Sequence, residues 1–463
     1  MIVHKFGGTS VGNAERMAHV AQLVTSSPDP ERVVVVSAMS GTTNALISAA
    51  RDAAAGTAET YIVTRQRLTD KHLRCLNEIL PPGPERDRLA GEINSRLDDM
   101  ERLCFAMGTL GELTPRGHDA VASIGEELSS RLLAAYLQGH GVAAEQVSAT
   151  EIIVTDDRHG EARPDLPATR NRVRARLLPL LERGIIPVVT GYIGATPAGV
   201  TTTLGRGGSD YTAALLGISL EAREVWVWSD VDGILTADPK LVPGAQRLPE
   251  LSYAEAEELA YFGADVLHPK TVKPLAEAGV PLRILNSLNP AQAGTLITAN
   301  PSPDRPVLPA IITTEELSLI QVLGNGSGWT LAMASRALAA LAQGNAEVFM
   351  FSQSFSERSL NLVVRSRDHS HSVHLLRTEF ARELREATIA GISAEVEVAA
   401  LSVVGVPDAH GTPITQRAFA ALSKHGLRII AVAQAASAYS VSFIIPERDV
   451  TAAVPFLHRE LGL

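Results

Sequence analysis

Cysteine is scarce in this sequence, and long uninterrupted apolar runs are absent. Cys75 and Cys104 are the only cysteines among 463 residues, and their spacing fits neither a disulfide framework nor a metal-binding motif. No run approaches the roughly 18 consecutive apolar residues that a membrane helix requires. The opening residues MIVHKFGG also lack the apolar stretch of a signal peptide. We therefore expect a cytoplasmic protein that does not span a membrane.

Positive charge is in deficit as well. The chain has 41 basic and 51 acidic residues, which gives a formal net charge of -10. A generally basic surface, of the kind that binds nucleic acid, is therefore not expected. The hydrophobic share of 45% and the charged share of 20% are ordinary for globular proteins, and the length indicates two or three domains. Small molecules are the expected partners.

Short β-branched runs alternate with helical patterns over the first 300 residues. The predicted strands are 1–6, 33–39, 185–194, 224–230 and 280–285, and the clearest predicted helices are 14–24, 43–54 and 126–138. Near-continuous apolar strands that alternate with helices are typical of a parallel sheet covered on both faces. The charged segment from about 60 to 105, broken by PPGPE at 81–85, is predicted to be a helical hairpin. This part of the chain is therefore predicted to be an α/β domain.

The chain beyond a proline-rich segment repeats itself. PSPDRPVLP at 301–309 has the composition of a restrained linker. After it, EVFMFSQSFSERSLNLVV and RIIAVAQAASAYSVSFII align at a fixed offset of 81 residues. The offset pairs Gln353 with Gln434, and it also pairs Gly324 with Gly405. Two copies of one βαββ-containing unit explain this better than chance similarity between two α/β stretches.

Two loops near the start of the chain carry groups suited to anions. Lys5 precedes the Gly7-Gly8 pair, whose backbone N–H groups could hold a phosphate before the first helix, although a plain tight turn explains the glycines equally well. Ser37 and Thr43 follow the second predicted strand, at the edge where open α/β sheets bind ligands, but Thr43 could instead cap a helix. Neither common nucleotide fingerprint, GxxxxGK[ST] or GxGxxG, occurs.

The segment GVTTTLGRGGSDYTAALLG at 199–217 is the strongest single signal. Glycines flank Arg206, whose planar guanidinium can bind a carboxylate or phosphate through two parallel hydrogen bonds. Helix capping explains Ser209 and Asp210 but not an arginine between glycines, so an anion site is the preferred interpretation. Taken alone, Glu126 is explained as a first-turn acid of a helix, and the acids after the strand at 224–230 as solvated turn residues.

Taken in order, these loops resemble the motifs of aspartate kinases, within the amino-acid kinase fold. The matching segments are KFGGTS, SAMSGTTN, the GE of SIGEELSS, TTTLGRGGSDYTAALL, WSDVDGILTADPK and FGADVLHPKT. The resemblance covers essentially the whole chain, because these enzymes also end in paired ACT domains, which the 81-residue repeat resembles. It implies a three-layer αβα sandwich with a mainly parallel sheet, followed by two ferredoxin-like βαββαβ domains.

The resemblance also implies a reaction and a set of site residues. The reaction is ATP-dependent phosphorylation of the β-carboxylate of L-aspartate, with Mg²⁺, as the first step of aspartate-family amino acid synthesis. Catalysis is assigned to Lys5, Arg206 and Asp210, and aspartate binding to Ser37, Thr43, Glu126, Arg206 and Ser209. ATP binding is assigned to Lys5, Gly7, Gly8, Ser229, Asp230, Leu235 and Lys240. Where many relatives have lysine, this chain has Asp265, so Lys240 or Lys270 would have to compensate, or nucleotide affinity is reduced.

The resemblance further predicts regulation. We expect a catalytic domain over 1–297 and a regulatory region over 298–463, with ACT domains at about 315–392 and at about 298–314 plus 393–463. Gln353 and Gln434 are the predicted effector residues, lysine or threonine the expected effector, and a homodimer or higher oligomer through the ACT domains the expected assembly. No homoserine dehydrogenase module is expected. The competing hypotheses are an inactive amino-acid sensor, a kinase for another acidic metabolite, and a purely structural role for the repeated tail.

Overall fold

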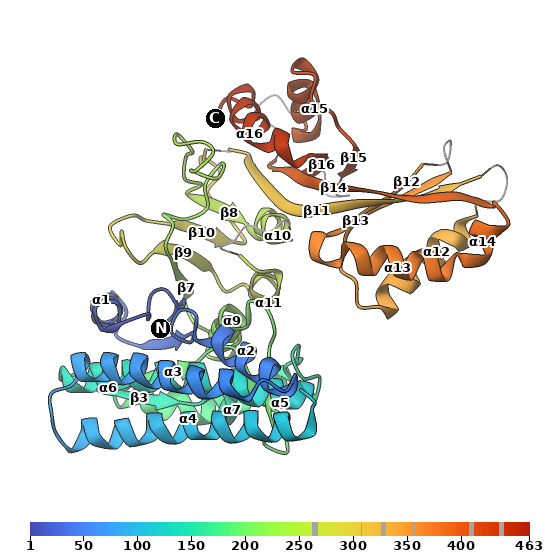
Figure 1. Cartoon of the computed structure of the whole chain (residues 1–463). Coiled ribbons are helices and arrows are strands. Elements are labelled where there is room, and N and C mark those ends of the chain that lie inside the picture. The colour runs from blue at the N-terminus through green and yellow to red at the C-terminus, as the bar shows by residue number, and fades with distance from the viewer. Residues whose placement is uncertain (262–266, 307, 326–329, 355–357, 407–411, 435–438) are drawn as a thin grey trace. The chain divides into compact units, whose positions relative to one another are not determined.

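The computed structural model describes residues 1–463 apart from 262–266, 307, 326–329, 355–357, 407–411 and 435–438 (Figure 1). The described residues divide into two compact units. The first comprises 1–234, 249–253 and 266–303, and the second comprises 235–248, 254–265 and 304–463. Among the described residues, no helix is long and apolar enough to cross a membrane.

The first unit is built on a mainly parallel sheet, as the alternating sequence pattern predicts. Its described strands lie in the order β3-β4-β2-β1-β7-β9-β10-β8, and only the β9 and β10 pair is antiparallel. The strands are β1 Ile2–Phe6, β2 Arg32–Val36, β3 Ala144–Val147, β4 Ile186–Thr190, β7 Glu224–Ser229, β8 Glu250–Ser252, β9 Leu282–Asn286 and β10 Thr295–Thr298. β1 and β4 are buried along their whole length, which accounts for their near-continuous apolar sequences.

Helices cover both faces of this sheet. The helices are α1 Ala14–Thr25, α2 Thr42–Ala54, α3 Ala58–Ile79, α4 Pro84–Leu110, α5 Pro115–Ala122, α6 Ile124–Gly139, α7 Ala149–Ile152, α8 Leu166–Glu182, α9 Gly208–Ser219 and α11 Pro269–Ala278. α6 packs on β2, β3 and β4, whereas α8 and α9 pack on the other face. The unit is therefore a three-layer αβα sandwich, and the predicted fold class is confirmed.

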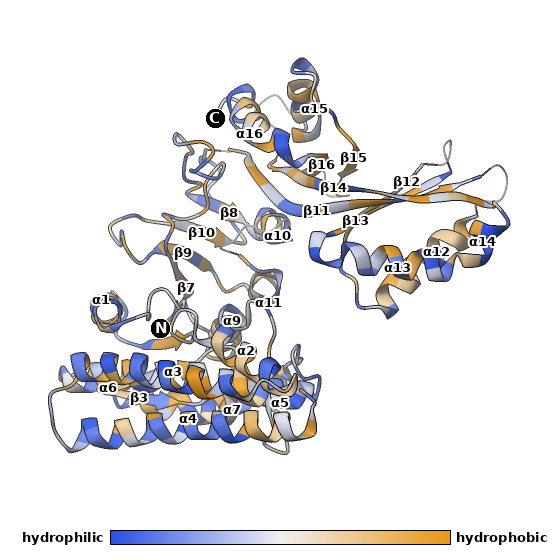
Figure 2. Cartoon of the chain, in the orientation of Figure 1, coloured by the Kyte–Doolittle hydropathy of each residue, from blue (hydrophilic) through white to orange (hydrophobic). Residues whose placement is uncertain are grey.

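The predicted helical hairpin is also present. α3 and α4 pack against each other, with the break at residues 80–83 (Figure 1). α4 buries residues spaced by three or four positions, namely Leu89, Ile93, Leu97, Met100, Cys104 and Met107. Its remaining face is mainly hydrophilic, apart from the exposed Phe105 and Leu110 near its C-terminal end (Figure 2). This amphipathic pattern keeps the hairpin in place on the core of the unit.

One predicted strand is shorter than expected. The segment 185–194 breaks after β4, where Tyr192 adopts a φ of 69°. The chain then turns away into β5 Ile193–Ala195, which pairs with β6 Thr201–Thr203 in a separate two-stranded sheet. A tyrosine in the left-handed region is uncommon, and no periodicity in the sequence signals it. The break places Tyr192 next to the loop that carries Arg206.

The second unit contains an antiparallel sheet in the order β12-β13-β11-β14-β16-β15. Its strands are β11 Ala310–Gly324, β12 Val348–Ser354, β13 Ser359–Arg365, β14 Ile389–Val404, β15 Ala431–Gln434 and β16 Ser440–Pro446. Its helices are α10 Tyr253–Tyr261, α12 Leu331–Gln343, α13 His369–Glu379, α14 Ala381–Arg385, α15 Ile414–Lys424 and α16 Val450–Glu460. Two 3₁₀ turns, Ser366–Asp368 and Glu447–Asp449, precede α13 and α16. The described elements form two successive β-α-β-β-α units in one sheet.

The 81-residue repeat is confirmed by these elements. β13 and β16, and likewise α13 and α16, begin and end at positions 81 residues apart. The two long strands, β11 and β14, pair with each other along most of their length and carry the matched residues Glu316 and Glu397, with φ of 57° and 61°. The repeated sequence therefore reproduces even an unusual backbone conformation in both copies.

Candidate active site

A cavity of about 560 Å³ lies where strands β1, β2 and β4 end and helix α9 begins. This is the edge at which open α/β sheets bind ligands. It brings together the predicted catalytic and aspartate-binding residues, which are Lys5, Ser37, Thr43, Glu126, Arg206, Ser209 and Asp210. These residues come from four separate segments of the sequence. The fold therefore gathers them at one place.

Lys5 and Asp210 form the charged centre of this cavity. Lys5 Nζ lies 2.7 Å from Asp210 Oδ1, and the contact is an ion pair rather than an aligned hydrogen bond. Lys5 is on β1, and Asp210 is in the first turn of α9. The loop after β1 passes close to the end of β2, since a Cβ atom on Gly8 would lie 2.6 Å from the carbonyl oxygen of Ala38. Glycine is therefore required at position 8.

The Arg206 loop owes its shape to glycine. Gly205 and Gly207 have φ of 76° and 73°, a region that other residues rarely adopt. A Cβ atom on Gly207 would also meet the His268 ring at 2.6 Å. Arg206 is exposed, and within the described residues it forms no hydrogen bond or ion pair. Its guanidinium is therefore available to an anion in the cavity.

Glu126 is the most buried acid of the site. Its Oε1 accepts a hydrogen bond of 3.3 Å from the Ala38 N–H, whereas its Oε2 is buried without a hydrogen-bond partner among the described residues. Burial raises the pKa of Glu126 to about 8. On the same helix, Ser129 Oγ donates to the Ser37 carbonyl at 2.7 Å. α6 therefore holds the loop after β2 and presents a carboxyl group that lacks a cation.

Asp119, which the sequence analysis did not identify, ties the loops around the cavity together. Its buried carboxylate accepts hydrogen bonds from Thr203 Oγ1 at 2.6 Å and from the N–H groups of Thr203 and Gly160 at 3.0 to 3.1 Å. His159 Nδ1 lies 2.8 Å from Asp119 Oδ2. Burial alone would raise the pKa of Asp119, but these bonds and His118 hold it below its usual value. Asp119 therefore positions the strand that leads to Arg206.

Further lining residues were also missed. The cavity is lined as well by Asn44, Ile47, His118, Gly160, Glu161 and Tyr192. The Tyr192 ring packs where a side chain on Gly208 would be, because a Cβ atom there would lie 2.7 Å from Tyr192 Cδ2. The glycine before Tyr192, inside the predicted strand 185–194, was the only available signal for Tyr192. Nothing local to the other segments indicates that they meet.

Comparison with known proteins identifies the family. The sequence profile of the amino acid kinase family matches residues 1–286, and an ACT domain profile matches 401–461. The chain is 35% identical to aspartokinase 1, chloroplastic, of Arabidopsis thaliana, over 99% of this chain and 79% of that protein. It therefore belongs to the aspartokinases, within the amino acid kinase family.

Solved aspartokinase structures match the whole chain. E. coli aspartokinase III in complex with aspartate and ADP (R-state) is 30% identical with a TM-score of 0.84, and the match covers 100% of both chains. The complex of the same enzyme with lysine and aspartate (T-state) is 31% identical with a TM-score of 0.79, over 100% of this chain and 99% of that one. By contrast, the chain spans about half the length of the bifunctional aspartokinase/homoserine dehydrogenases that it matches.

The residues predicted to bind ATP are divided between the two units. Gly7 and Gly8 follow β1, directly after Lys5. Ser229 ends β7, and its hydroxyl donates to Asp230 Oδ1 at 3.2 Å. Leu235 and Lys240 belong to the second unit, where the Lys240 N–H donates to Asp238 Oδ1 at 2.9 Å. Their role in nucleotide binding stays a prediction.

Asp265, which stands where many relatives are expected to have lysine, lies outside the described residues. Lys270 is described. Its Nζ donates to the carbonyl of Leu204 at 3.0 Å and lies close to Gly205. Lys270 therefore holds the backbone just before Arg206. Whether it also serves a nucleotide stays a prediction.

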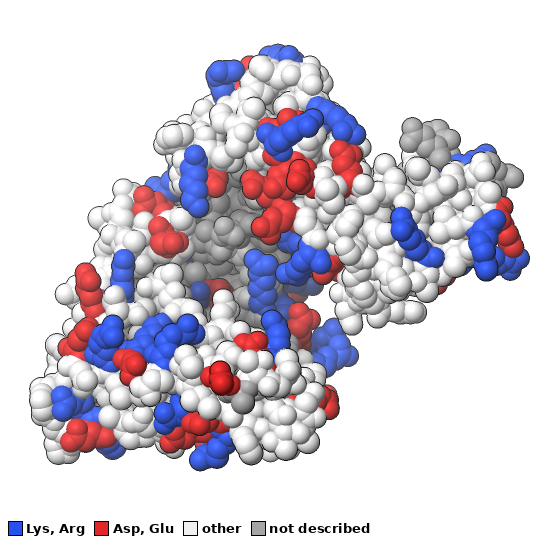
Figure 3. Space-filling model, viewed as in Figure 1, with Lys and Arg blue, Asp and Glu red and all other residues white. Residues whose placement is uncertain are grey.

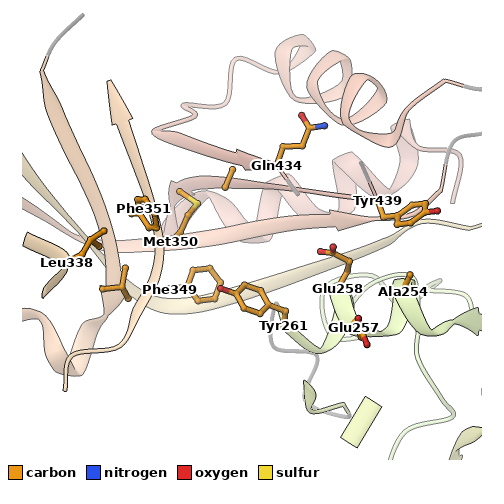
Figure 4. Close-up of a pocket in the computed structure, with 12 residues that line it drawn as sticks. Ala254, Glu257, Glu258, Tyr261, Leu338, Phe349, Met350, Phe351, Gln434 and Tyr439 are labelled. Atoms are coloured by element: carbon orange, nitrogen blue, oxygen red, sulfur yellow. The ribbon is translucent and has the colours of Figure 1, made fainter. Parts of the chain in front are cut away.

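A second cavity, of about 720 Å³, lies within the second unit (Figure 4). Gln434 lines it together with Glu257, Glu258 and Tyr261 of α10 and with an apolar stretch of β12, whereas Gln353 does not. Ser440 Oγ donates to Glu258 Oε2 at 2.6 Å, which links β16 to α10. This cavity therefore includes only one of the two predicted effector residues, and their role in effector binding stays a prediction.

Proposed function

We propose that this protein transfers the γ-phosphoryl group of ATP to the β-carboxylate of L-aspartate, which yields 4-phospho-L-aspartate and ADP. The observation that carries the proposal is the grouping of Lys5, Asp210, Arg206 and Glu126 around one cavity of suitable size. The match to aspartokinase III in complex with aspartate and ADP supports the same substrates. The product is the first intermediate of aspartate-family amino acid synthesis.

Aspartate is proposed to bind with its α-carboxylate held by Arg206 and its ammonium group held by Glu126. Arg206 offers two parallel hydrogen bonds to the α-carboxylate, and Glu126 Oε2 offers a buried acceptor to the ammonium group. Ser37, Thr43 and Ser209 would bind the remaining polar atoms. This arrangement directs the β-carboxylate toward Lys5 and Asp210. It explains why an arginine stands between glycines and why a buried acid lacks a partner.

The chemistry itself needs little from the protein beyond alignment and charge. A substrate carboxylate is already ionised at pH 7, so no general base is required. Lys5 would stabilise charge on the phosphoryl oxygens, and the N–H groups of the Gly7-Gly8 loop would hold the phosphates in line with the acceptor. Asp210 holds the Lys5 ammonium in place at 2.7 Å. Ser229, Asp230, Leu235 and Lys240 are retained as the proposed adenine and ribose site.

Mg²⁺ is proposed to arrive with the nucleotide. The described residues contain no group of three or more His, Cys, Asp or Glu side chains that could hold a metal alone. Asp210, Glu126 and Glu161 are the acids that line the cavity, and Asp210, beside Lys5, is the proposed contact of the ion. Mg²⁺ is commonly bound by one or two carboxylates plus substrate phosphates. The donor set therefore fits a nucleotide-borne ion, which would neutralise phosphate charge.

Feedback control through the second unit is also part of the proposal. The ACT profile match and the lysine complex of aspartokinase III support an amino acid effector. Lysine or threonine is the proposed effector, and Gln353 and Gln434 are its proposed contacts. We further propose a homodimer or higher oligomer formed through the ACT sheet, and domain boundaries as predicted above. A cytoplasmic location is kept in the proposal, because both cysteines are buried and free.

The test is a coupled assay of ADP release by the purified full chain. ATP and Mg²⁺ are supplied with aspartate, with glutamate or with no acceptor. We expect ADP release that depends on aspartate. Equal release with glutamate would instead indicate a kinase for another acidic metabolite, and no release with any acceptor would indicate an inactive sensor.

A further inference from the structure

The first unit contains another cavity, of about 760 Å³, between α3 and the loops that follow β1 and β2. We call it the α3 cavity. One wall is α3, and the other is formed by Gly12, Asn13 and Met39. Met39 lies between Ser37 and Thr43, which line the active site on the other side of the same loop. A molecule in the α3 cavity would therefore touch the backbone that shapes the substrate site.

Three cationic side chains line the α3 cavity. Arg67, Lys71 and Arg74 are spaced by four and three residues, so they share one face of α3. Arg67 and Arg74 are exposed, and neither forms a hydrogen bond or ion pair within the described part of the chain. Lys and Arg side chains gather over α3 and the adjoining end of α1 on the face in Figure 3. Arg67 and Arg74 are therefore free to bind an anion.

Two acids also line the cavity, but within the described residues neither forms an ion pair with Arg67, Lys71 or Arg74. Asp70 Oδ1 accepts a hydrogen bond of 2.8 Å from Gln66 Nε2, and Glu78 lies one turn beyond Arg74. Lys71 is half-buried, and burial, with the nearby Arg67 as a second cause, lowers its pKa. A bound oxyanion between Arg67 and Lys71 would relieve this repulsion between like charges. The cavity therefore favours a ligand that carries negative charge.

Lys71 connects the α3 cavity to the active site. Its Nζ donates to the carbonyl oxygen of Ser40 at 2.6 Å and lies 3.5 Å from Thr42 Oγ1. The Ser40 N–H in turn donates to the Gly8 carbonyl at 3.0 Å. Lys71 thus holds the loop that carries Ser37 and Thr43, and that loop holds the glycine pair after Lys5. An anion that attracts Lys71 would compete with this contact.

We propose that the α3 cavity is a binding site for a small oxyanion metabolite, bearing phosphate or several carboxylates, and that the bound anion acts on the substrate loop through Lys71. The cavity volume is in the range that accommodates small metabolites. This site is separate from the amino acid effector proposed for the second unit. The binding half of the proposal stands alone, whereas the regulatory half rests on the proposed kinase activity.

Binding is tested by calorimetry on the full chain in an Arg206→Ala background, which weakens anion binding in the active site. Inorganic phosphate and citrate are the two probes, and they distinguish phosphate from carboxylate ligands. We expect saturable binding of at least one probe. Further substitution with Arg67→Ala and Arg74→Ala should weaken it at least about tenfold.

The matched control is Arg102→Ala, on α4, because Arg102 is exposed, pairs with Asp99 and lies outside the cavity. This control should leave probe binding unchanged. Absence of saturable binding by both probes would overturn the proposal. Equal affinity in the double variant and in the control would overturn it as well.

Coupling is tested by initial rates of ADP formation at several aspartate concentrations. The bound anion should change the KM for aspartate at least about twofold in the wild type and in Arg102→Ala, but not in Lys71→Met. Lys71→Arg should restore the response, since it keeps a donor near Ser40. An equal response in Lys71→Met, with an unchanged melting temperature, would show that Lys71 does not carry the effect. If ADP is not formed at all, calorimetry still decides the binding site.

Discussion

Lys5 Nζ, on strand β1, lies 2.7 Å from Asp210 Oδ1, in the first turn of helix α9. The pair joins two segments that are distant in sequence, and both residues line the same cavity as Arg206 and Glu126. Partial burial strengthens an ion pair relative to one in bulk water. Asp210 therefore positions the Lys5 ammonium before any substrate binds.

Replacement of Lys5 should mainly reduce turnover. Lys5→Ala removes a cation whose contact with the phosphoryl oxygens strengthens as the bond to ADP breaks, so kcat should fall while KM for aspartate changes little. Steady-state rates with either substrate varied measure both constants. Lys5→Arg is the control that keeps the charge. An unchanged kcat in Lys5→Ala would remove Lys5 from the mechanism.

Replacement of Arg206 should mainly weaken aspartate binding. Loss of one partner of a charged hydrogen-bonded pair costs about 2–5 kcal/mol, or roughly 30-fold to 4,000-fold. Arg206→Ala should therefore raise the KM for aspartate far more than the KM for ATP. Arg206→Lys keeps the charge but not the two parallel bonds, so its KM for aspartate should lie between those of the wild type and of Arg206→Ala. Equal changes in both KM values would mean that Arg206 binds phosphate.

The buried Glu126 should make the free protein less stable as pH rises. Its pKa in the folded state is about 8, against an ordinary value of 4.5. Between these values the unfolded chain releases the proton while the folded chain keeps it. The free energy of unfolding therefore falls as pH rises from about 4.5 to about 8. Glu126→Gln removes this dependence.

Urea unfolding at pH 5.5, 7 and 8.5 measures the effect. The wild type should lose stability relative to Glu126→Gln across this range. Saturating aspartate should reduce the loss, since its ammonium would favour the ionised form of Glu126. Parallel pH profiles of the two proteins without aspartate would contradict the assignment of a raised pKa to this residue.

Asp119→Asn should damage both stability and aspartate binding. The substitution weakens the charge-assisted bonds to Thr203 and Gly160. Leaving a buried hydrogen-bonding group unsatisfied lowers the free energy of unfolding by about 1–3 kcal/mol. Urea unfolding and the KM for aspartate measure the two effects. Thr203→Val removes only the side-chain bond, so it should cause a smaller loss of stability and a smaller rise in the KM for aspartate. An altered stability with unchanged KM would show that the network is structural alone.

An amino acid effector should alter the rate through the second unit. The enzyme is titrated with lysine, threonine and methionine, singly and paired, while aspartyl phosphate formation is measured. At least one should inhibit at millimolar concentration, with a coupling of about 1–3 kcal/mol. Gln353→Ala and Gln434→Ala should weaken that inhibition. If no amino acid binds or changes the rate, the ACT sheet serves assembly instead.

The sequence predicted what depends on local pattern. Strands β1, β2, β7 and β9 were found from apolar runs, and the repeat was found from residues that match at one offset. The arginine between glycines at position 206 indicated an anion site, and the flanking glycines adopt φ values of 76° and 73°, which are accessible mainly to glycine.

Contacts between distant segments could not be predicted in the same way. Asp119 meets Thr203 across 84 residues, and Lys71 meets Ser40 across 31. Neither residue differs in its local sequence from an ordinary helical acid or base. Tyr192 was missed because its φ of 69° ends a strand that the apolar pattern would continue. These features depend on the packed fold, which one sequence does not display.

Trapping the product is the most direct test of aspartate phosphorylation by this protein. The full chain is incubated with ATP, Mg²⁺ and L-aspartate in the presence of hydroxylamine, which converts an acyl phosphate to a hydroxamate. We expect L-aspartyl 4-hydroxamate in amounts that match the ADP released, with none in Lys5→Ala over the same time. ADP release without the hydroxamate, or the hydroxamate of glutamate at an equal rate, would contradict it.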